Sequence, residues 1–212
     1  MKSLTDLQRA LHGETDRALA ATFAEAEARA GKPYACRAGC SACCHQIVLC
    51  TAPEAMLIAD HLRATLTAAQ LETAAGKLDA QSEAGAGLGF LEYSRARIPC
   101  AFLDAKGACS IYEVRPMACR ALKSFSVTAC ERVPESLSDL GSHLIPGSGP
   151  GLRTAKALGV QHYRTLAEDA KIEPQDFTLM LPRAVAIALA AGEVELVPAF
   201  DPARVPGFCA GG

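Results

Sequence analysis

The stretch CRAGCSACC constrains this chain more than any other, because four of its nine residues are cysteines: Cys36, Cys40, Cys43 and Cys44. On a helix this spacing places all four side chains on one face. On a turn, the gap between Cys40 and Cys43 lets two thiolates hold one metal ion. Either backbone crowds sulfur atoms together, and crowded thiols must be protonated, oxidised or neutralised by a cation. The stretch therefore favours a metal site.

Further cysteines extend this interpretation. Cys100, Cys109 and Cys119 form a second group along the sequence, with Cys130 as a possible fourth member. Successive side chains diverge, so we expect Cys43 and Cys44 not to bind one ion together, which favours a polynuclear centre or two neighbouring sites. The eight residues could supply up to two four-thiolate sites. Cys50, in the apolar run IVLC, is expected to be a buried hydrophobe, and Cys209 in the tail to have no ligand role.

Composition narrows the class of protein. The net charge is -2 and the pI is near 6.2, which does not point to nucleic acid or to an anionic membrane as a partner. The first thirty residues interleave charges with apolar side chains and do not resemble a signal peptide, and there is no apolar stretch long enough to cross a membrane. We therefore expect a cytoplasmic protein. In a reducing compartment, clustered cysteines favour metal binding over disulfides.

The chain is rich in helix-forming residues and predicts a mostly α fold with little strand. Helices are expected over about 3–30, from 51, over 68–82 with a weak interruption at Gly76, over 152–170 and from about 174 to 192. We expect one compact domain over 1–212: a cysteine core at about 34–130 around a bound metal, a helical scaffold at 1–33 and 150–192, and an irregular tail at 193–212. The glycine-rich run 83–89 is expected to be a linker, and His12 and His162 to be surface or satisfied side chains.

Two motifs carry a resemblance to a known family. The first is CRAGCSACC followed by the helix start TAPEA, and the second is PCAFLDAKGACSIYEVRPMACRAL. Their order and spacing resemble those of the YkgJ-like CxxCxxCC cysteine-cluster family, whose members are described as zinc- or iron-chelating domains. In the second motif the matching residues are Pro99, Cys100, Phe102, Leu103, Gly107, Cys109, Ile111, Tyr112, Arg115, Pro116, Cys119 and Arg120. The resemblance implies metal chelation and a bacterial origin.

The metal and the activity stay open at this point. Zinc prefers closed four-thiolate sites, whereas iron–sulfur clusters such as 4Fe-4S admit irregular cysteine spacing, and the excess of thiols favours the cluster slightly. Arg115 and Arg120 are candidates to offset thiolate charge or to bind a small anionic ligand, and Tyr112 and Phe102 to cover the centre. The alternative to a metal-binding module is an enzyme, a protein lysine N-methyltransferase-like or redox transferase acting on a protein or small substrate.

Overall fold

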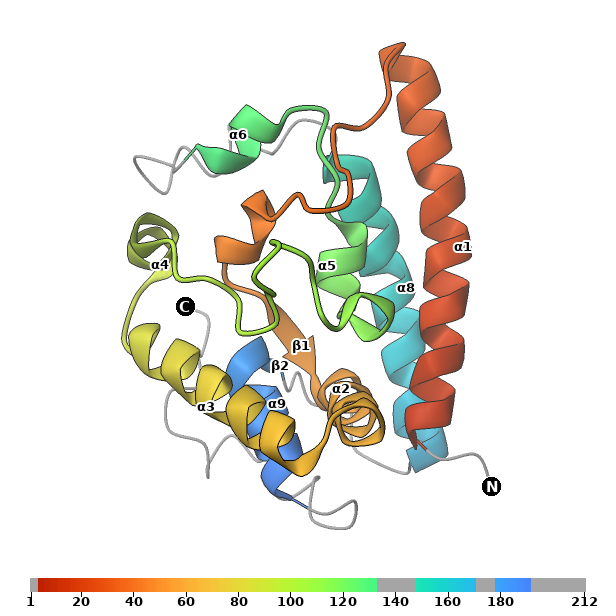
Figure 1. Cartoon of the computed structure of the whole chain (residues 1–212). Helices are drawn as coiled ribbons and strands as arrows, with labels where there is room; N and C mark the ends of the chain where they lie inside the picture. The colour runs from red at the N-terminus through yellow and green to blue at the C-terminus, as the bar shows by residue number, and fades with distance from the viewer. Residues whose placement is uncertain (1–3, 133–147, 171–177, 192–212) are drawn as a thin grey trace.

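The computed structural model describes residues 4–132, 148–170 and 178–191, and these are mostly helical, as predicted (Figure 1). In chain order the elements are α1 (Leu4–Ala30), η1 (Ala42–His45), β1 (Leu49–Thr51), α2 (Ala52–Thr65), α3 (Ala68–Ala84), α4 (Phe90–Ala96), η2 (Tyr112–Val114), α5 (Met117–Ala121), α6 (Val127–Glu131), α8 (Ser148–Ala170), β2 (Thr178–Met180) and α9 (Leu181–Ala190). Here η marks a 3-10 helix. Within the described ranges, no helix combines the length and apolarity needed to cross a membrane.

The two longest helices described, α1 and α8, run side by side, and α5 packs against both (Figure 1). A small apolar cluster fills the space between them, made by Leu19, Phe23, Tyr34, Ala121 and Ala155. The close approach depends on Gly151 in the first turn of α8, where an added Cβ would overlap the carbonyl oxygen of Ala121. This packing fixes α5, which carries Cys119, against the long helix pair.

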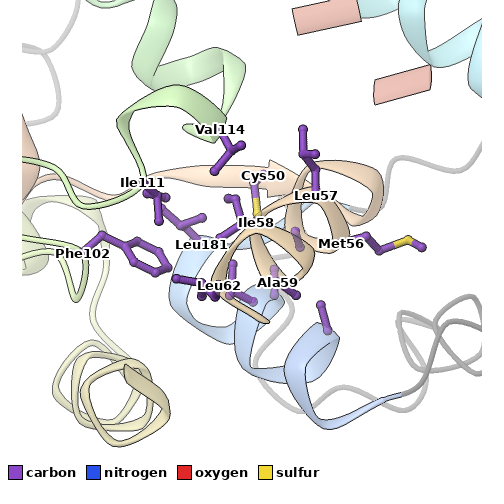
Figure 2. Close-up of a cluster of buried hydrophobic side chains, with 14 of the residues drawn as sticks. Cys50, Met56, Leu57, Ile58, Ala59, Leu62, Phe102, Ile111, Val114 and Leu181 are labelled. Carbon is purple, nitrogen blue, oxygen red and sulfur yellow. The ribbon is translucent and has the colours of Figure 1, made fainter. Parts of the chain in front are cut away.

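The main core lies between α2, α3 and α9, next to the short antiparallel pairing of β1 with β2. Figure 2 shows side chains of α2 and Leu181 of α9 pointing toward one another there, with Phe102, Ile111 and Val114 entering from the second cysteine motif. Cys50 is only 1% exposed in this cluster, which confirms it as a buried hydrophobe. The loop that carries Cys100 and Cys109 is therefore anchored in the core.

Several helix boundaries follow the sequence signals. Gly31, with φ of +63°, closes α1, and a capping box between Thr51 and Glu54 opens α2. The predicted interruption at Gly76 is wrong, because α3 runs through it.

The final helix begins only at Leu181, since the residues before it pair with β1 as β2. Cys209 and the predicted tail lie outside the described residues.

A buried polar group at the interface of α1, α2 and α8 was not expected. His12 and His162 are 3% and 4% exposed, and none of their ring nitrogens has a hydrogen-bond partner among the described residues. Of the two predicted alternatives, a surface position is therefore wrong, and each ring lies next to a carboxylate. The nearest carboxylates are those of Glu54, 3.6 Å from His12 Nε2, and Glu14, 3.6 Å from His162 Nε2. Both distances exceed a normal hydrogen bond.

This polar group predicts a stability change in mild acid. Burial lowers the pKa of His162 below 6.5, with the nearby His12 also lowering it and Glu14 and Glu54 opposing this. A histidine with a lowered folded pKa contributes its stability above the unfolded pKa, and loses it as pH falls below that value. We expect the urea midpoint to fall between about pH 7 and pH 5, and to fall less steeply in the His162→Gln variant. Equal slopes in both proteins would contradict this assignment.

Candidate metal centre

The first cysteine motif changes backbone conformation halfway. Cys36 and Cys40 lie on a turn, closed by the Cys40 N–H donating to the carbonyl oxygen of Arg37 at 3.0 Å, with Gly39 at φ of +78°. Cys43 and Cys44 lie on the 3-10 helix η1. Of the two backbones that the spacing allowed, the turn therefore holds for the first pair and a short helix for the second. The four side chains do not share one helical face.

The second motif is bound to the first by its backbone. The Cys100 N–H donates to the carbonyl oxygen of Cys44 at 2.8 Å. From there the chain forms a tight turn, whose Asp104 carboxylate accepts the N–H groups of Lys106 and Ala108. Gly107 at the tip has φ of +73°, and an added Cβ there would stand 3.4 Å from the carbonyl oxygen of Gly39. Two segments that are far apart in the sequence thus meet at Cys44, which contacts Cys100, and at Gly39, which lies next to Gly107.

Cys119 is positioned by a buried carboxylate. Glu54 Oε1 accepts the Met117 N–H at 2.7 Å, and Oε2 accepts the Thr51 N–H at 2.9 Å. One side chain therefore caps α2 and holds the start of α5, on which Cys119 lies. Although burial opposes it, the His12 imidazole 3.6 Å away and the hydrogen bonds from these amides keep the pKa of Glu54 below its usual value. The capping box was visible in the sequence, but the contact with Met117 was not.

The thiols of Cys43, Cys100, Cys109 and Cys119 lie near one another, and we name these four residues the inner thiol group. Burial, together with the nearby Cys109 and Cys43, raises the pKa of Cys100 to about 11 against the lowering effect of the Phe102 backbone N–H. Burial also raises the pKa values of Cys119 and Cys109. The pKa of Cys43 is raised mainly by a hydrogen bond with Cys44, and burial is the second cause. Without a cation these thiols are therefore protonated at neutral pH.

Four predicted ligands remain, and apart from Cys44 on η1 itself they lie before η1 or on α6. Cys36 and Cys40 are on the turn, and Cys130 is on α6, which packs against η1. We name Cys36, Cys40 and Cys130 the outer thiol group. Cys130 was expected as a possible fourth member of the set Cys100, Cys109 and Cys119; after burial, the thiols that raise its pKa are Cys36, Cys43 and Cys40, all from the first motif. The grouping in space therefore differs from the grouping along the sequence.

The side chains of the adjacent residues Cys43 and Cys44 also lie differently from what the sequence predicted. The Cys43 and Cys44 thiols are within hydrogen-bonding reach of each other, so their side chains do not point apart. The tight 3-10 turn of η1 brings neighbouring side chains closer than an extended backbone does. However, the charges that act on Cys100, Cys109 and Cys119 come from Cys43 and not from Cys44. Cys43 is therefore the residue of the pair that faces the inner thiol group.

The two arginines have different surroundings. The guanidinium of Arg120 is buried and donates to Asp16 Oδ2 at 2.6 Å and to the carbonyl oxygens of Arg115 and Glu113. Arg115 lies near the inner thiol group, where its charge lowers the pKa values of Cys43, Cys109 and Cys119. Its buried Nε has no hydrogen-bond partner among the described residues. The buried Nε of Arg115 thus differs from the donors of Arg120, which all bind oxygen atoms of the protein.

The two aromatic residues expected to cover the centre, Phe102 and Tyr112, differ in how far they are buried. Phe102 is 4% exposed and packs in the main core, as a covering residue should. Tyr112 is 63% exposed, so the prediction that it packs is wrong for this residue. The Arg115 guanidinium carbon lies 3.6 Å from the centroid of the Tyr112 ring. Tyr112 therefore holds Arg115 by a cation–π contact at the surface.

The donor set fits a thiophilic metal. Zinc and iron–sulfur clusters both bind cysteine thiolates, and neither needs the carboxylates that a magnesium or calcium site requires. Among the described residues, no three His, Cys, Asp or Glu side chains are already arranged to hold an ion. The thiols must therefore rotate to converge on a metal. Within the inner thiol group, Cys43 and Cys119 lie on the short helices η1 and α5, and Cys100 and Cys109 lie on the loop between these helices.

A comparison with known protein families finds a match for the segment that carries the clustered cysteines. Residues 35–136 match the model of the CxxCxxCC family, described as "Putative zinc- or iron-chelating domain". The predicted family is confirmed for this segment, which contains both thiol groups and their connecting helices. No curated protein and no solved structure matches the chain.

Proposed function

We propose that this chain chelates zinc or an iron–sulfur centre through the thiolates of Cys43, Cys100, Cys109 and Cys119. The observation that carries the proposal is the meeting of these four thiols from three separate segments in one partly buried place. Burying four thiols this close raises their pKa values, and a cation that replaces their protons removes the repulsion. The family match supports metal chelation in general, and the choice of these four ligands is our proposal.

Arg115 is proposed to offset the negative charge of the loaded centre. Its guanidinium lies close enough to three of the four thiols to lower their pKa values, and Tyr112 keeps it in place. With its unpartnered Nε it also offers a donor to a carboxylate or phosphate that approaches the centre. Arg120, in contrast, is proposed to be structural, because its ion pair with Asp16 ties α5 to α1.

Anaerobic purification followed by iron, zinc and acid-labile sulfide analysis tests the proposal. We expect metal bound by the full chain, and the iron–sulfur form predicts a brown protein with sulfide in proportion to iron. A colourless protein with zinc and no sulfide would select the zinc form. Neither metal in protein from metal-supplemented, anaerobically grown cells would refute the proposed function.

The enzyme alternative requires a polar pocket beside the metal. A surface hollow does lie between α1 and α8, lined by residues that include Thr22, Arg29 and Arg153. It contains none of the cysteines, so it does not place a substrate beside the inner thiol group. A metal-binding module is therefore the function that the described residues support best.

A further inference from the structure

A buried glutamine lies beside the loop that carries Cys100. Gln81 is in the last turn of α3 and is 8% exposed. Its Oε1 accepts the N–H of Ala101 at 2.8 Å, and its Nε2 donates to the hydroxyl oxygen of Tyr93 at 2.9 Å. The orientation of the amide follows from the Ala101 N–H, because this group can only donate and must face the amide oxygen. One side chain thus links α3, α4 and the loop of the second cysteine motif.

Tyr93 lies close to the same loop and is 1% exposed. Its ring packs against Gly85 at the end of α3, where an added Cβ would stand 2.7 Å from Tyr93 Cε2. Gly85 belongs to the glycine-rich run that was expected to be a linker, and here it makes room for the ring. Burial raises the pKa of the phenol, the hydrogen bond from Gln81 lowers it, and the nearby Cys100 raises it. Gln81 and Tyr93 therefore lie next to the inner thiol group.

The backbone of Cys100 is held on both sides of its Cα atom. Its N–H donates to the carbonyl oxygen of Cys44 at 2.8 Å, and its carbonyl oxygen accepts the Leu103 N–H at 3.0 Å. The next N–H, that of Ala101, donates to Gln81. These contacts set the direction in which the Cys100 side chain leaves the backbone. Of these contacts, the one with Gln81 is made by a side chain, so a substitution can remove it and leave the backbone contacts in place.

We propose that Gln81 is a positioning residue of the metal centre, which orients Cys100 toward the other three inner thiols, and that Tyr93 holds the Gln81 amide in place. Residues around a metal site commonly act in this way, because they fix the direction of a ligand that is itself free to rotate. Neither Gln81 nor Tyr93 is a ligand in this proposal. The inference rests on the proposed function and extends it to the residues that support one of its four ligands.

Competition for Zn²⁺ between the reduced, metal-free full chain and a chromophoric chelator tests this role. We expect Gln81→Leu to weaken Zn²⁺ binding by about 10- to 100-fold, since it removes the acceptor of the Ala101 N–H. Gln81→Glu should recover most of the affinity, because a carboxylate can accept that N–H and the Tyr93 hydroxyl can donate to it. Leu71→Ala is the matched control and should leave the affinity unchanged, because Leu71 lies on the same helix and packs against the main core.

A second measurement uses the metal-free chain. Labelling with iodoacetamide, read by mass spectrometry, should modify Cys100 faster in Gln81→Leu than in the unmodified chain, because the loop has lost a contact. Cys36, which is exposed, should react at the same rate in both. Tyr93→Phe keeps the ring against Gly85 and removes the hydroxyl, so its effect on affinity should lie between those of Gln81→Leu and Gln81→Glu. If the chain carries an iron–sulfur cluster, the rate at which a ferrous-iron chelator removes the iron replaces the Zn²⁺ affinity.

The outcomes separate the two proposals. Absence of any zinc or iron binding by the unmodified chain would refute the proposed function. Metal binding by the unmodified chain, with Gln81→Leu equal to Leu71→Ala in affinity and in labelling of Cys100, would refute the positioning role alone. Equal losses in Gln81→Leu and Gln81→Glu would also overturn it, because the effect would then not come from the hydrogen bond to Ala101. An unchanged affinity in Tyr93→Phe would show that Tyr93 does not hold the amide.

Discussion

Replacing Glu54 with alanine is expected to lower the free energy of unfolding by about 3 kcal/mol or more, the largest loss that we expect from one substitution outside the apolar core. The carboxylate accepts the N–H groups of Thr51 and Met117 and faces His12 at 3.6 Å, and it is 5% exposed. Its removal leaves two amides without their acceptor and an imidazole without its nearest anion. Urea denaturation at pH 7 measures the effect.

Glu72→Ala is the matched control, because Glu72 lies exposed on α3. We expect it to change stability by less than about 0.5 kcal/mol. A Glu54→Ala chain as stable as this control would show that Glu54 does not hold α5. The pKa of Glu54 is lowered in the folded chain, so its contribution is present above the unfolded value of 4.5 and is lost as pH falls through the folded value. The difference between the two variants should therefore shrink in acid.

Serine at position 43 is expected to abolish metal binding by the inner thiol group, whereas serine at position 44 should leave most of it. The reason is orientation, since Cys43 and not Cys44 acts on Cys100, Cys109 and Cys119. The Cys44 backbone still matters, because its carbonyl oxygen accepts the Cys100 N–H, but serine keeps that carbonyl. Metal content after anaerobic purification of each variant gives the comparison.

The two serine variants are matched controls for each other, because each removes one thiol from the same short helix. Equal metal loss would contradict the division of roles and indicate that both sulfurs bind the centre. Circular dichroism of both variants checks that the helices remain. If Cys44→Ser lost the metal and Cys43→Ser kept it, Cys44 would replace Cys43 in the inner thiol group. These outcomes bear on the ligand set and leave the family assignment unaffected.

The helices could be predicted where local signals agree. The charged and apolar pattern before Gly31, and the capping box at Thr51 and Glu54, set the limits of α1 and α2 from the sequence alone. The final helix was placed too early because the pairing of Leu49 with Met180 is a long-range contact. Such pairing depends on where β1 lies after folding, and no local propensity in residues 178–180 indicates it.

The cysteines were found from the sequence, but their arrangement was not. Spacing brings Cys36 to Cys44 into one motif, whereas the structure places a turn before Cys40 and a 3-10 helix at Cys43 and Cys44. The division arises from the change of backbone at Ser41. Cys130 lies on α6, a five-residue helix with a weak sequence signal. The contact of Ser124 with Cys36 is equally non-local, and no motif marks it.

The salt bridge between Arg120 and Asp16 has a consequence for the limits of the matched segment. Arg120 lies inside residues 35–136, but its carboxylate partner lies on α1, outside them. The same is true of Glu54 and His12, and of Ala121 with Leu19 and Phe23. A fragment cut at the limits of the family match would leave two charged side chains and an apolar surface uncovered. The packing of the segment that carries the cysteines therefore depends on α1, which lies outside those limits.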